Sequence, residues 1–174
     1  MSSEMREIFH RYLDSYSQRN FKSLNQILSK KLSGFGTGED ENTFDIDFRD
    51  LYKRDFVQIP KGLTFTIYNE DYHVLSTTCF IALAIFDISA EINGMPHTLF
   101  SNRLSCVFNK SVDENNEWKI VHMHLSAPLP IQEDGESAPI KELQRQNQEL
   151  ERLVKLKTQE LLSINETLSQ KNAE

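Results

Sequence analysis

The stretch EWKIVHMHLSAPLP, residues 117–130, decides the fold of the N-terminal part of this 174-residue chain. Residues of different polarity alternate along it as far as Pro128, which is typical of a β-strand with two unlike faces. The apolar set, Val121, Met123 and Leu125, is expected to face a hydrophobic core. The mixed set is expected to form a sheet surface that pairs with a second subunit, and its members are Trp118, Ile120, His122, His124 and Ser126.

Three further strands are expected upstream, and with the first they form an antiparallel meander. Apolar and polar residues alternate over 63–68, and residues 79–92 are a long β-rich run. That run stops at Asn93-Gly94, the strongest short hairpin signal, after which 97–109 is expected to pair back. A polar turn at 113–116 then leads into the strand described above.

Three helices are expected before the strands. The first has one apolar stripe at a period of 3.6 residues, formed by Met5, Ile8, Phe9, Tyr12, Leu13 and Tyr16. A second helix is expected from Asn20, a good N-cap, to Leu28, and a third from about Thr43 to Phe56. Between the last two lies a glycine-rich loop. Helices followed by strands predict an α+β fold in which three helices pack on a curved antiparallel sheet.

Two of these stretches resemble a known superfamily. GFGTGEDE at 34–41 and the run 117–130 are similar to nuclear transport factor two-like proteins, also called SnoaL-like or cystatin-like cone proteins. The second run, with the segment 92–98, is especially similar to the association (hub) domain of type-two calcium/calmodulin-dependent protein kinases. The resemblance covers about residues 1–130. It implies a cone with a cavity between helices and sheet, and dimers formed through the sheet, but no single function, since members range from isomerases to oligomerisation hubs.

The two histidines of the final strand can be read in two ways. His122 and His124 are two residues apart, so their imidazoles share a face and could ligate a metal. No spacing selects a third ligand among His97, Cys106 and nearby acids. The alternative, which we favour, places both histidines at a sheet surface or dimer interface. We therefore expect no metal and no cofactor.

Arg103 is the best candidate for a ligand-binding residue. It shares a strand face with Ser105, and in a cone interior its charge would need an anionic or polar partner, because burying an unpaired charge is costly. The alternative is an exposed Arg103, or one paired with Asp47 or Asp87. The two alternatives stay open at this point.

The resemblance also bears on the cavity. The hub's pocket is rich in arginine, and the matching positions here are Ile85, Ser105 and Leu125. The resemblance thus implies a more apolar cavity than that of the hub. The expected ligand-binding set combines polar contacts with aromatic and aliphatic residues, namely Arg103, Ser105, Tyr12, Phe48, Tyr52, Ile85 and Leu125.

A SnoaL-like isomerase or hydratase is the rival interpretation. Such an enzyme needs a carboxylate base in an apolar cavity and an acid such as tyrosine. Asp47 or Asp87 could supply the base, and the candidate acids are Tyr12, Tyr16, Tyr52 and Tyr68. No motif selects a pair, and no catalytic-triad, P-loop or Rossmann signature is present. We expect this chain not to be an enzyme, and a pure oligomerisation hub is a further alternative.

The C-terminal part predicts a parallel coiled coil. A linker at 131–138 separates it from the domain at 1–130, and the helix runs over 139–174. With Ile140 as heptad position a, seven of ten a and d positions are aliphatic: Ile140, Leu143, Leu150, Val154, Leu161, Ile164 and Leu168. Asn147 at position a is the polar residue that fixes register in parallel two-stranded coils. These side chains, with Trp118, His122 and His124, are the expected homodimer interface.

This helix resembles the signalling helices that join bacterial input domains to output domains. The resemblance implies a covalently linked histidine kinase or diguanylate cyclase (GGDEF) domain, and the pattern suggests that the chain is part of a longer protein. The whole is therefore read as an input module that binds a small molecule, dimerises and passes a signal through the coil.

Composition narrows the possible partners. The chain has 19 Lys and Arg against 26 Asp and Glu, a net charge of −7, and no basic stripe, which argues against nucleic acid and anionic membranes. The longest apolar run, 79–86, is far shorter than the roughly 20 residues of a membrane-spanning helix. The polar N-terminus lacks a signal peptide, so a cytoplasmic location is expected. Cys79 and Cys106 are expected to be reduced thiols.

Overall fold

A computed structural model describes residues 2–92, 95–110, 112–128, 135 and 137–172 of the chain. The chain divides into two units, Met1–Pro128 and Leu129–Glu174, and each is described by itself below. None of the helices in the described ranges is long and apolar enough to cross a membrane.

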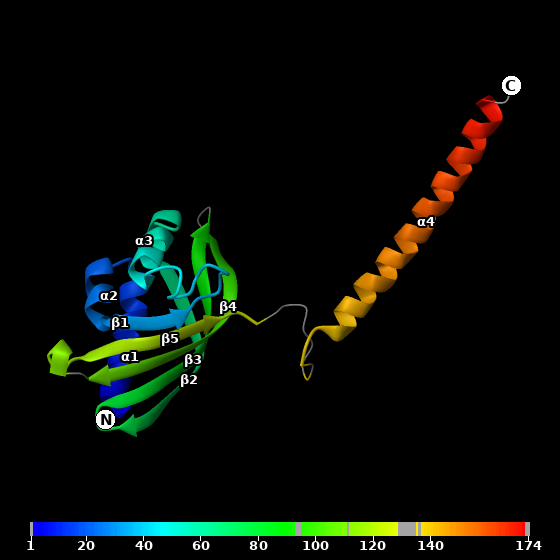
Figure 1. Ribbon diagram of the computed structural model, residues 1–174. Coiled ribbons are helices and arrows are strands. Elements are labelled where there is room, and N and C mark those ends of the chain that lie inside the picture. Colours follow the sequence, from blue (N-terminus) through cyan, green and yellow to red (C-terminus); the bar gives the residue numbers. More distant parts are fainter. Residues whose placement is uncertain (1, 93–94, 111, 129–134, 136, 173–174) are drawn as a thin grey trace. The chain divides into compact units, whose positions relative to one another are not determined.

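The first unit is an α+β cone. Its helices are α1 (Ser2–Ser17), α2 (Phe21–Ile27) and α3 (Phe48–Gln58), and Figure 1 shows them on one side of a curved sheet. The strands are β1 (Leu28–Phe35), β2 (Leu63–Ser76), β3 (Cys79–Ile92), β4 (Met95–Lys110) and β5 (Trp118–Ser126), with a short 3-10 helix at Val112–Glu114. The predicted α+β class is confirmed. The predicted hairpin residues 93–94 lie outside the described residues.

The sheet is mixed, whereas a purely antiparallel sheet was expected. Its strand order is β1-β5-β4-β3-β2, and β1 runs parallel to β5 while every other pair is antiparallel. The sequence of β1, LSKKLSGF, was read as the end of a helix and a loop. Gly34 in this strand allows the close approach to β5, because a Cβ here would collide with the Met123 carbonyl oxygen.

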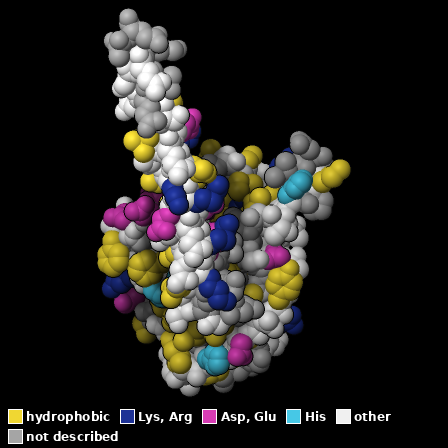
Figure 2. All heavy atoms as spheres, turned by 90° about the vertical axis from the view of Figure 1, so that its right-hand side faces the viewer, with side chains coloured by type: hydrophobic (Ala, Val, Ile, Leu, Met, Phe, Trp, Pro, Cys, Tyr) yellow, Lys and Arg dark blue, Asp and Glu magenta, His cyan; other side chains and the backbone are white. Residues whose placement is uncertain are grey.

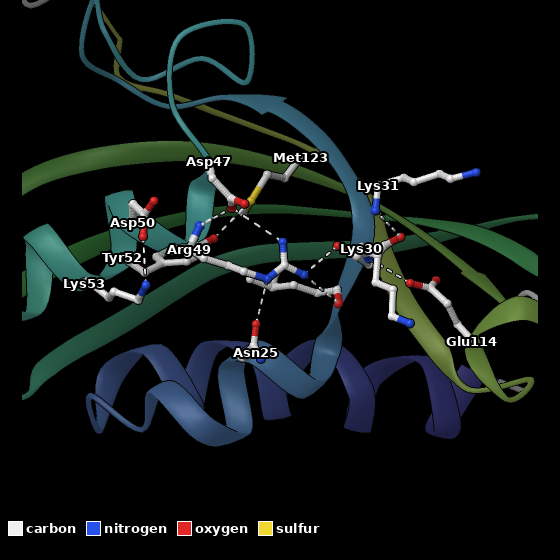
Figure 3. Close-up of polar contacts among 12 residues, drawn as sticks. Asn25, Lys30, Lys31, Asp47, Arg49, Asp50, Tyr52, Lys53, Glu114 and Met123 are labelled. Carbon is white, nitrogen blue, oxygen red and sulfur yellow. Dashed lines mark hydrogen bonds and ion pairs between the residues drawn. The ribbon is translucent and has the colours of Figure 1, made fainter.

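Helix α3 begins later than predicted. Asp47 caps it by accepting a hydrogen bond from the Arg49 backbone N–H (2.8 Å). The expected start near Thr43 is wrong, and Phe44 is 87% exposed. The Arg49 side chain fixes the helix to its neighbours, since it donates to Asn25 Oδ1 (2.7 Å) and to the Ser29 carbonyl oxygen (2.8 Å), as Figure 3 shows.

One face of the sheet is covered by the helices and forms the core. Its fully buried aromatic side chains include Phe80 and Phe108, which stack with ring centroids 4.7 Å apart. Alternate residues of β3 and β4 point to the other face, which the three helices do not cover, so Leu83 and Ile85 are exposed. We call this second surface the open sheet face.

A bulge in β5 changes which residues share a face. Val107 pairs with His122 but Phe108 pairs with Ile120, so Val121 is an extra residue in the ladder. Trp118 and Ile120 therefore turn to the helix-covered side, and the prediction that they share a face with His122 is wrong. The Trp118 indole packs edge-on against Phe80, with ring centroids 4.8 Å apart. It also donates a hydrogen bond to Glu4 of α1 (2.8 Å).

The second unit contains α4 (Ile140–Asn172), a helix of 33 residues that is about 50 Å long at 1.5 Å per residue. The prediction of a long C-terminal helix is confirmed, and its pairing as a coiled coil stays a prediction. The seven aliphatic side chains at positions a and d are 48% to 63% exposed. Hydrophobic side chains lie beside charged ones on its surface (Figure 2), and ion pairs such as Glu142–Arg145 (2.8 Å) link successive turns.

Candidate functional site: an apolar cavity between helices and sheet

A cavity of about 230 Å³ lies between α1, α3 and the helix-covered face of the sheet. Its wall is mostly aliphatic and aromatic. Helices α1 and α3 contribute residues from successive turns of their apolar stripes, and β2 to β5 contribute the floor. The main apolar lining residues are Tyr12, Leu13, Phe48, Leu51, Tyr52, Ile59, Leu63, Phe65, Phe86, Ile88, Leu99, Leu104, Met123 and Leu125. An apolar pocket with a few convergent polar groups is the usual form of a small-molecule site.

The polar side of the lining centres on Asp55 of α3. The Tyr16 hydroxyl, from α1, donates a hydrogen bond to Asp55 Oδ2 (3.1 Å). Burial raises the pKa of the Asp55 carboxyl above its ordinary value, and the hydrogen bond from Tyr16 partly opposes this shift. Burial, with the nearby Asp55 charge, also raises the pKa of Tyr16. The site thus holds a carboxylate in an environment that disfavours its charge.

Two further tyrosine hydroxyls lie close together in the buried part of the cavity wall. The hydroxyl oxygens of Tyr12 and Tyr52 are 3.1 Å apart, and the Tyr52 hydroxyl donates to the Met123 sulfur (3.1 Å; Figure 3). Both tyrosines are buried, and burial raises the pKa of each hydroxyl well above its ordinary value. The two hydroxyls therefore stay neutral and act as hydrogen-bonding groups only.

The loop 36–41 completes the wall with Gly36, Thr37 and Glu41. Glu41 Oε2 accepts hydrogen bonds from the backbone N–H groups of Thr37 (2.9 Å) and Gly38 (3.0 Å). Arg54 of α3 holds the loop from outside, with ion pairs to Asp40 (2.6 Å) and Glu41 (2.8 Å). One helix thus supplies both the Asp55 carboxylate and the arginine that anchors the loop.

The predicted ligand-binding residues fall into two groups. Tyr12, Phe48, Tyr52 and Leu125 line the cavity together. Ile85, Arg103 and Ser105 lie on the open sheet face, where they line a separate shallow hollow with His124. The expectation of Arg103 inside the cone is wrong, because the more apolar alternate residues of β4, Leu104, Cys106 and Phe108, are the buried ones.

The open sheet face holds both predicted histidines. His122 Nδ1 lies 2.9 Å from the Ser33 hydroxyl oxygen on β1, and the His124 ring lies edge-on to Phe35, with centroids 5.8 Å apart. Among the described residues, no group of three or more His, Cys, Asp or Glu side chains is placed to hold a metal ion. Each histidine contacts a residue of β1, His122 through Ser33 and His124 through Phe35.

Sequence reasoning missed Asp55. The base candidates that it considered lie elsewhere: Asp47 caps α3, and Asp87 accepts a hydrogen bond from Tyr68 (2.6 Å) outside the cavity. A signal was nevertheless present. Asp55 follows Phe48, Leu51 and Tyr52 at i+7, i+4 and i+3, so it interrupts the apolar stripe of its helix.

This cone with a cavity between helices and sheet matches a known family. Residues 5–130 match the SnoaL-like domain, and the chain belongs to that family. No curated protein matches the sequence.

Several solved structures share the fold. A nuclear transport factor 2-like superfamily protein from Salmonella enterica is 23% identical (TM-score 0.61), and the match covers 78% of this chain and 96% of that one. The association domain of CaMKII from C. elegans is 19% identical (TM-score 0.58), covering 72% and 95%. A candidate ketosteroid isomerase from Shewanella frigidimarina is 17% identical (TM-score 0.53), covering 69% and 92%. At these identities the likeness concerns the fold alone.

Proposed function

We propose that this chain is a ligand-sensing and dimerisation module of a cytoplasmic bacterial signalling protein. A small molecule binds in the cavity, two copies pair through the open sheet face, and α4 forms a parallel coiled coil. Ligand binding alters the dimer, and the coiled coil passes this alteration to a covalently linked histidine kinase or diguanylate cyclase domain.

The cavity is the observation that carries the proposal. Close-packed protein interiors leave few voids larger than a water molecule, whereas this space measures about 230 Å³. Its wall joins apolar surface to a small number of polar groups, of which Asp55 and Tyr16 are hydrogen-bonded to each other. A space of this kind suits an organic molecule better than water alone, because most of the wall offers water no partner.

The open sheet face supports the dimer. Ile85 is 46% exposed and Leu83 is 38% exposed on this face, and His122 and His124 lie on the neighbouring strand β5. Apolar side chains in the centre with polar groups around them are typical of a protein–protein interface. Trp118, which was expected at this interface, is not part of it in the proposal, because it packs against Phe80 on the helix-covered side.

The apolar seam of α4 supports the coil. Its seven aliphatic residues recur with a heptad spacing, and Asn147 occupies an a position. An Asn at this position can pair with its own copy when two helices are parallel and in register. A twofold dimer of the cone starts both α4 helices from equivalent positions, which agrees with parallel pairing.

Ligand binding can be tested with a cavity-filling variant. A neutral probe, 2-phenylethanol, should raise the unfolding midpoint of the full chain in a saturable way. In Leu125→Phe the larger ring occupies the cavity, so the rise should be lost, while Val57→Phe, on an exposed part of α3, should keep it. No rise in the wild-type chain, or an equal rise in both variants, would contradict ligand binding in this cavity.

Transmission can be tested by crosslinking in α4. Leu150→Cys at a d position, in a Cys79→Ser background, should form an intermolecular disulfide on mild oxidation, since the remaining Cys106 is buried. Addition of 2-phenylethanol should change the crosslinking rate. A rate that is unaffected although the probe binds would favour a pure oligomerisation hub.

A second candidate function is isomerisation of a small ketone. The observation that favours it is Asp55 with raised pKa beside Tyr16 in an apolar wall, since such a carboxylate can take a proton from carbon and return it. The wild-type chain would then convert 3-cyclohexen-1-one to 2-cyclohexen-1-one faster than buffer, and Asp55→Asn would abolish the acceleration while Asp50→Asn kept it. Equal rates for all three proteins would exclude this function for that substrate.

A further inference from the structure

The cavity wall is acidic. Its described lining residues include two carboxylates, Asp55 and Glu41, and no Lys, Arg or His. The hollow on the open sheet face, by contrast, contains Arg103. A ligand inside the cone therefore meets negative charge and hydroxyl groups, and a carboxylate ligand would be repelled there.

Asp55 retains hydrogen-bonding capacity toward the cavity. Its Oδ2 accepts from Tyr16, and among the described residues no side chain forms an ion pair with this carboxylate. A carboxylate can accept about four hydrogen bonds, so Oδ1 is available to a ligand. A charged partner would also stabilise the ionised form of a group that is partly removed from water.

Two arginines lie near the cavity. Arg54 binds Asp40 and Glu41. Arg19 lies over the Tyr16 and Phe56 rings and its Nε donates to the Ile59 carbonyl oxygen (3.0 Å), whereas its Nη2 is buried without a hydrogen-bond partner among the described residues. Both cations moderate the negative charge of the site from outside, but neither lines the cavity.

The volume limits the size of the ligand. An apolar cavity of about 150 Å³ in another protein holds one benzene molecule. The cavity here, at about 230 Å³, has room for one ring with a short side chain.

We propose that the cavity binds a single-ring-sized apolar molecule that carries a protonated amine, with the ring among Phe48, Phe86 and Leu104 and the ammonium group on Asp55. This inference rests on the proposed function, because it names the ligand class of the same cavity. An ammonium group that replaces water on a partly buried carboxylate forms a charge-assisted hydrogen bond, which is stronger than a neutral one.

Three probes of nearly equal size test the proposal on the full chain: 2-phenylethylamine, 2-phenylethanol and phenylacetate. Titration calorimetry at pH 7.5 should give an affinity for the amine at least tenfold higher than for the alcohol, and no measurable binding of phenylacetate. Asp55→Asn keeps an oxygen to accept from Tyr16 but removes the charge, so it should bring the amine and the alcohol within twofold. Asp50→Asn, on the same helix and paired with Lys53, should keep the preference.

The outcomes separate the ligand class from ligand binding itself. Equal binding of amine and alcohol by the wild-type chain, or stronger binding of phenylacetate, would overturn the ammonium site and leave a ligand-binding cavity. No binding of any probe would contradict both. A preference that persists in Asp55→Asn would overturn the role of Asp55. If that variant does not fold, the wild-type preference among the three probes decides the question alone.

Discussion

The hydroxyl of Tyr16 donates a hydrogen bond of 3.1 Å to Asp55 Oδ2 and so joins α1 to α3 across the polar side of the cavity. The two residues are 39 positions apart in the sequence. Burial acts in the same sense on both groups, because it raises the pKa of each: it keeps the tyrosine neutral and makes the ionised aspartate less favourable. On our proposal, a carboxylate in this position lowers the stability of the empty domain in exchange for a ligand site, a trade-off that is common at functional sites.

The difference in stability between Asp55→Asn and the wild type should depend on pH in a defined direction. A carboxyl with a raised folded-state pKa binds its proton more tightly when folded, so its contribution to the free energy of unfolding falls as the pH rises from the unfolded pKa through the folded one. Above that interval the ionised Asp55 is destabilising. The variant should therefore unfold at a higher temperature than the wild type at pH 7.5, and the difference should vanish below about pH 4.

Asp50→Asn is the matched control for this measurement. Asp50 lies exposed in the first turn of α3, where an acid interacts favourably with the helix dipole. Its replacement should leave stability unchanged or lower it slightly at pH 7.5. A lower midpoint for Asp55→Asn than for the wild type at this pH would show that the carboxylate stabilises the fold, against our account.

A charge placed on the open sheet face should weaken the dimer. Ile85→Asp would bury an unpaired carboxylate between two sheets, which is strongly unfavourable. Sedimentation equilibrium of the full chain should show a dimer dissociation constant raised at least about tenfold. Val57→Asp introduces the same charge at an exposed position of α3, 80% exposed, and should leave the constant unchanged. Equal effects would rule out this face as the interface.

Trp118→Phe should reduce stability without affecting dimerisation. The indole donates to Glu4 and lies under the Lys110 ammonium group, 4.6 Å from the ring centroid. Loss of the hydrogen bond and weakening of the cation–π contact should lower the free energy of unfolding by about 1 to 2 kcal/mol. Urea denaturation measures the loss, and sedimentation tests the dimer. A weakened dimer with unchanged unfolding would place Trp118 at the interface as first expected.

Adjacent residues of α4 provide a matched test of the coil. Leu161 occupies an a position and Leu162 a b position, and both are about 60% exposed (63% and 59%). Leu161→Lys places a charge in the seam and should lower the midpoint of the thermal loss of helix monitored at 222 nm. Leu162→Lys should leave that transition in place. The same result for both variants would mean that no heptad seam is used.

Sequence patterns predicted those elements of the fold in which burial alternates regularly. The bounds of β3 and β5 agree with the runs 79–92 and 118–126. Burial alternates regularly along β3, whereas the bulge at Val121 breaks the alternation in β5 without changing where that strand begins and ends. The strand β1 was missed, since LSKKLSGF has no regular alternation and its partner β5 lies about 90 residues further along. A parallel edge strand of this kind is specified by its neighbour more than by its own residues.

Regular spacing also explains which residues of the candidate site could be predicted. Tyr12, Phe48 and Tyr52 belong to helical stripes whose direction follows from spacing alone, and all three line the cavity. For strand residues, the sequence predicted the face of the sheet less reliably. Ile85 alternates with residues that are equally apolar, so polarity could not choose its face, and the extra residue at Val121 reversed the face of Trp118.

Methyl NMR of the methionines tests the central claim, ligand binding between helices and sheet, most directly. Met123 lines the cavity, Met5 is buried outside its lining, and Met95 is 66% exposed at the start of β4. In the full chain labelled with ¹³C at the methionine methyl groups, titration with 2-phenylethylamine should shift the Met123 signal in a saturable way and leave the Met95 signal in place. An unmoved Met123 signal at millimolar probe, or equal shifts at Met123 and Met95, would contradict the account.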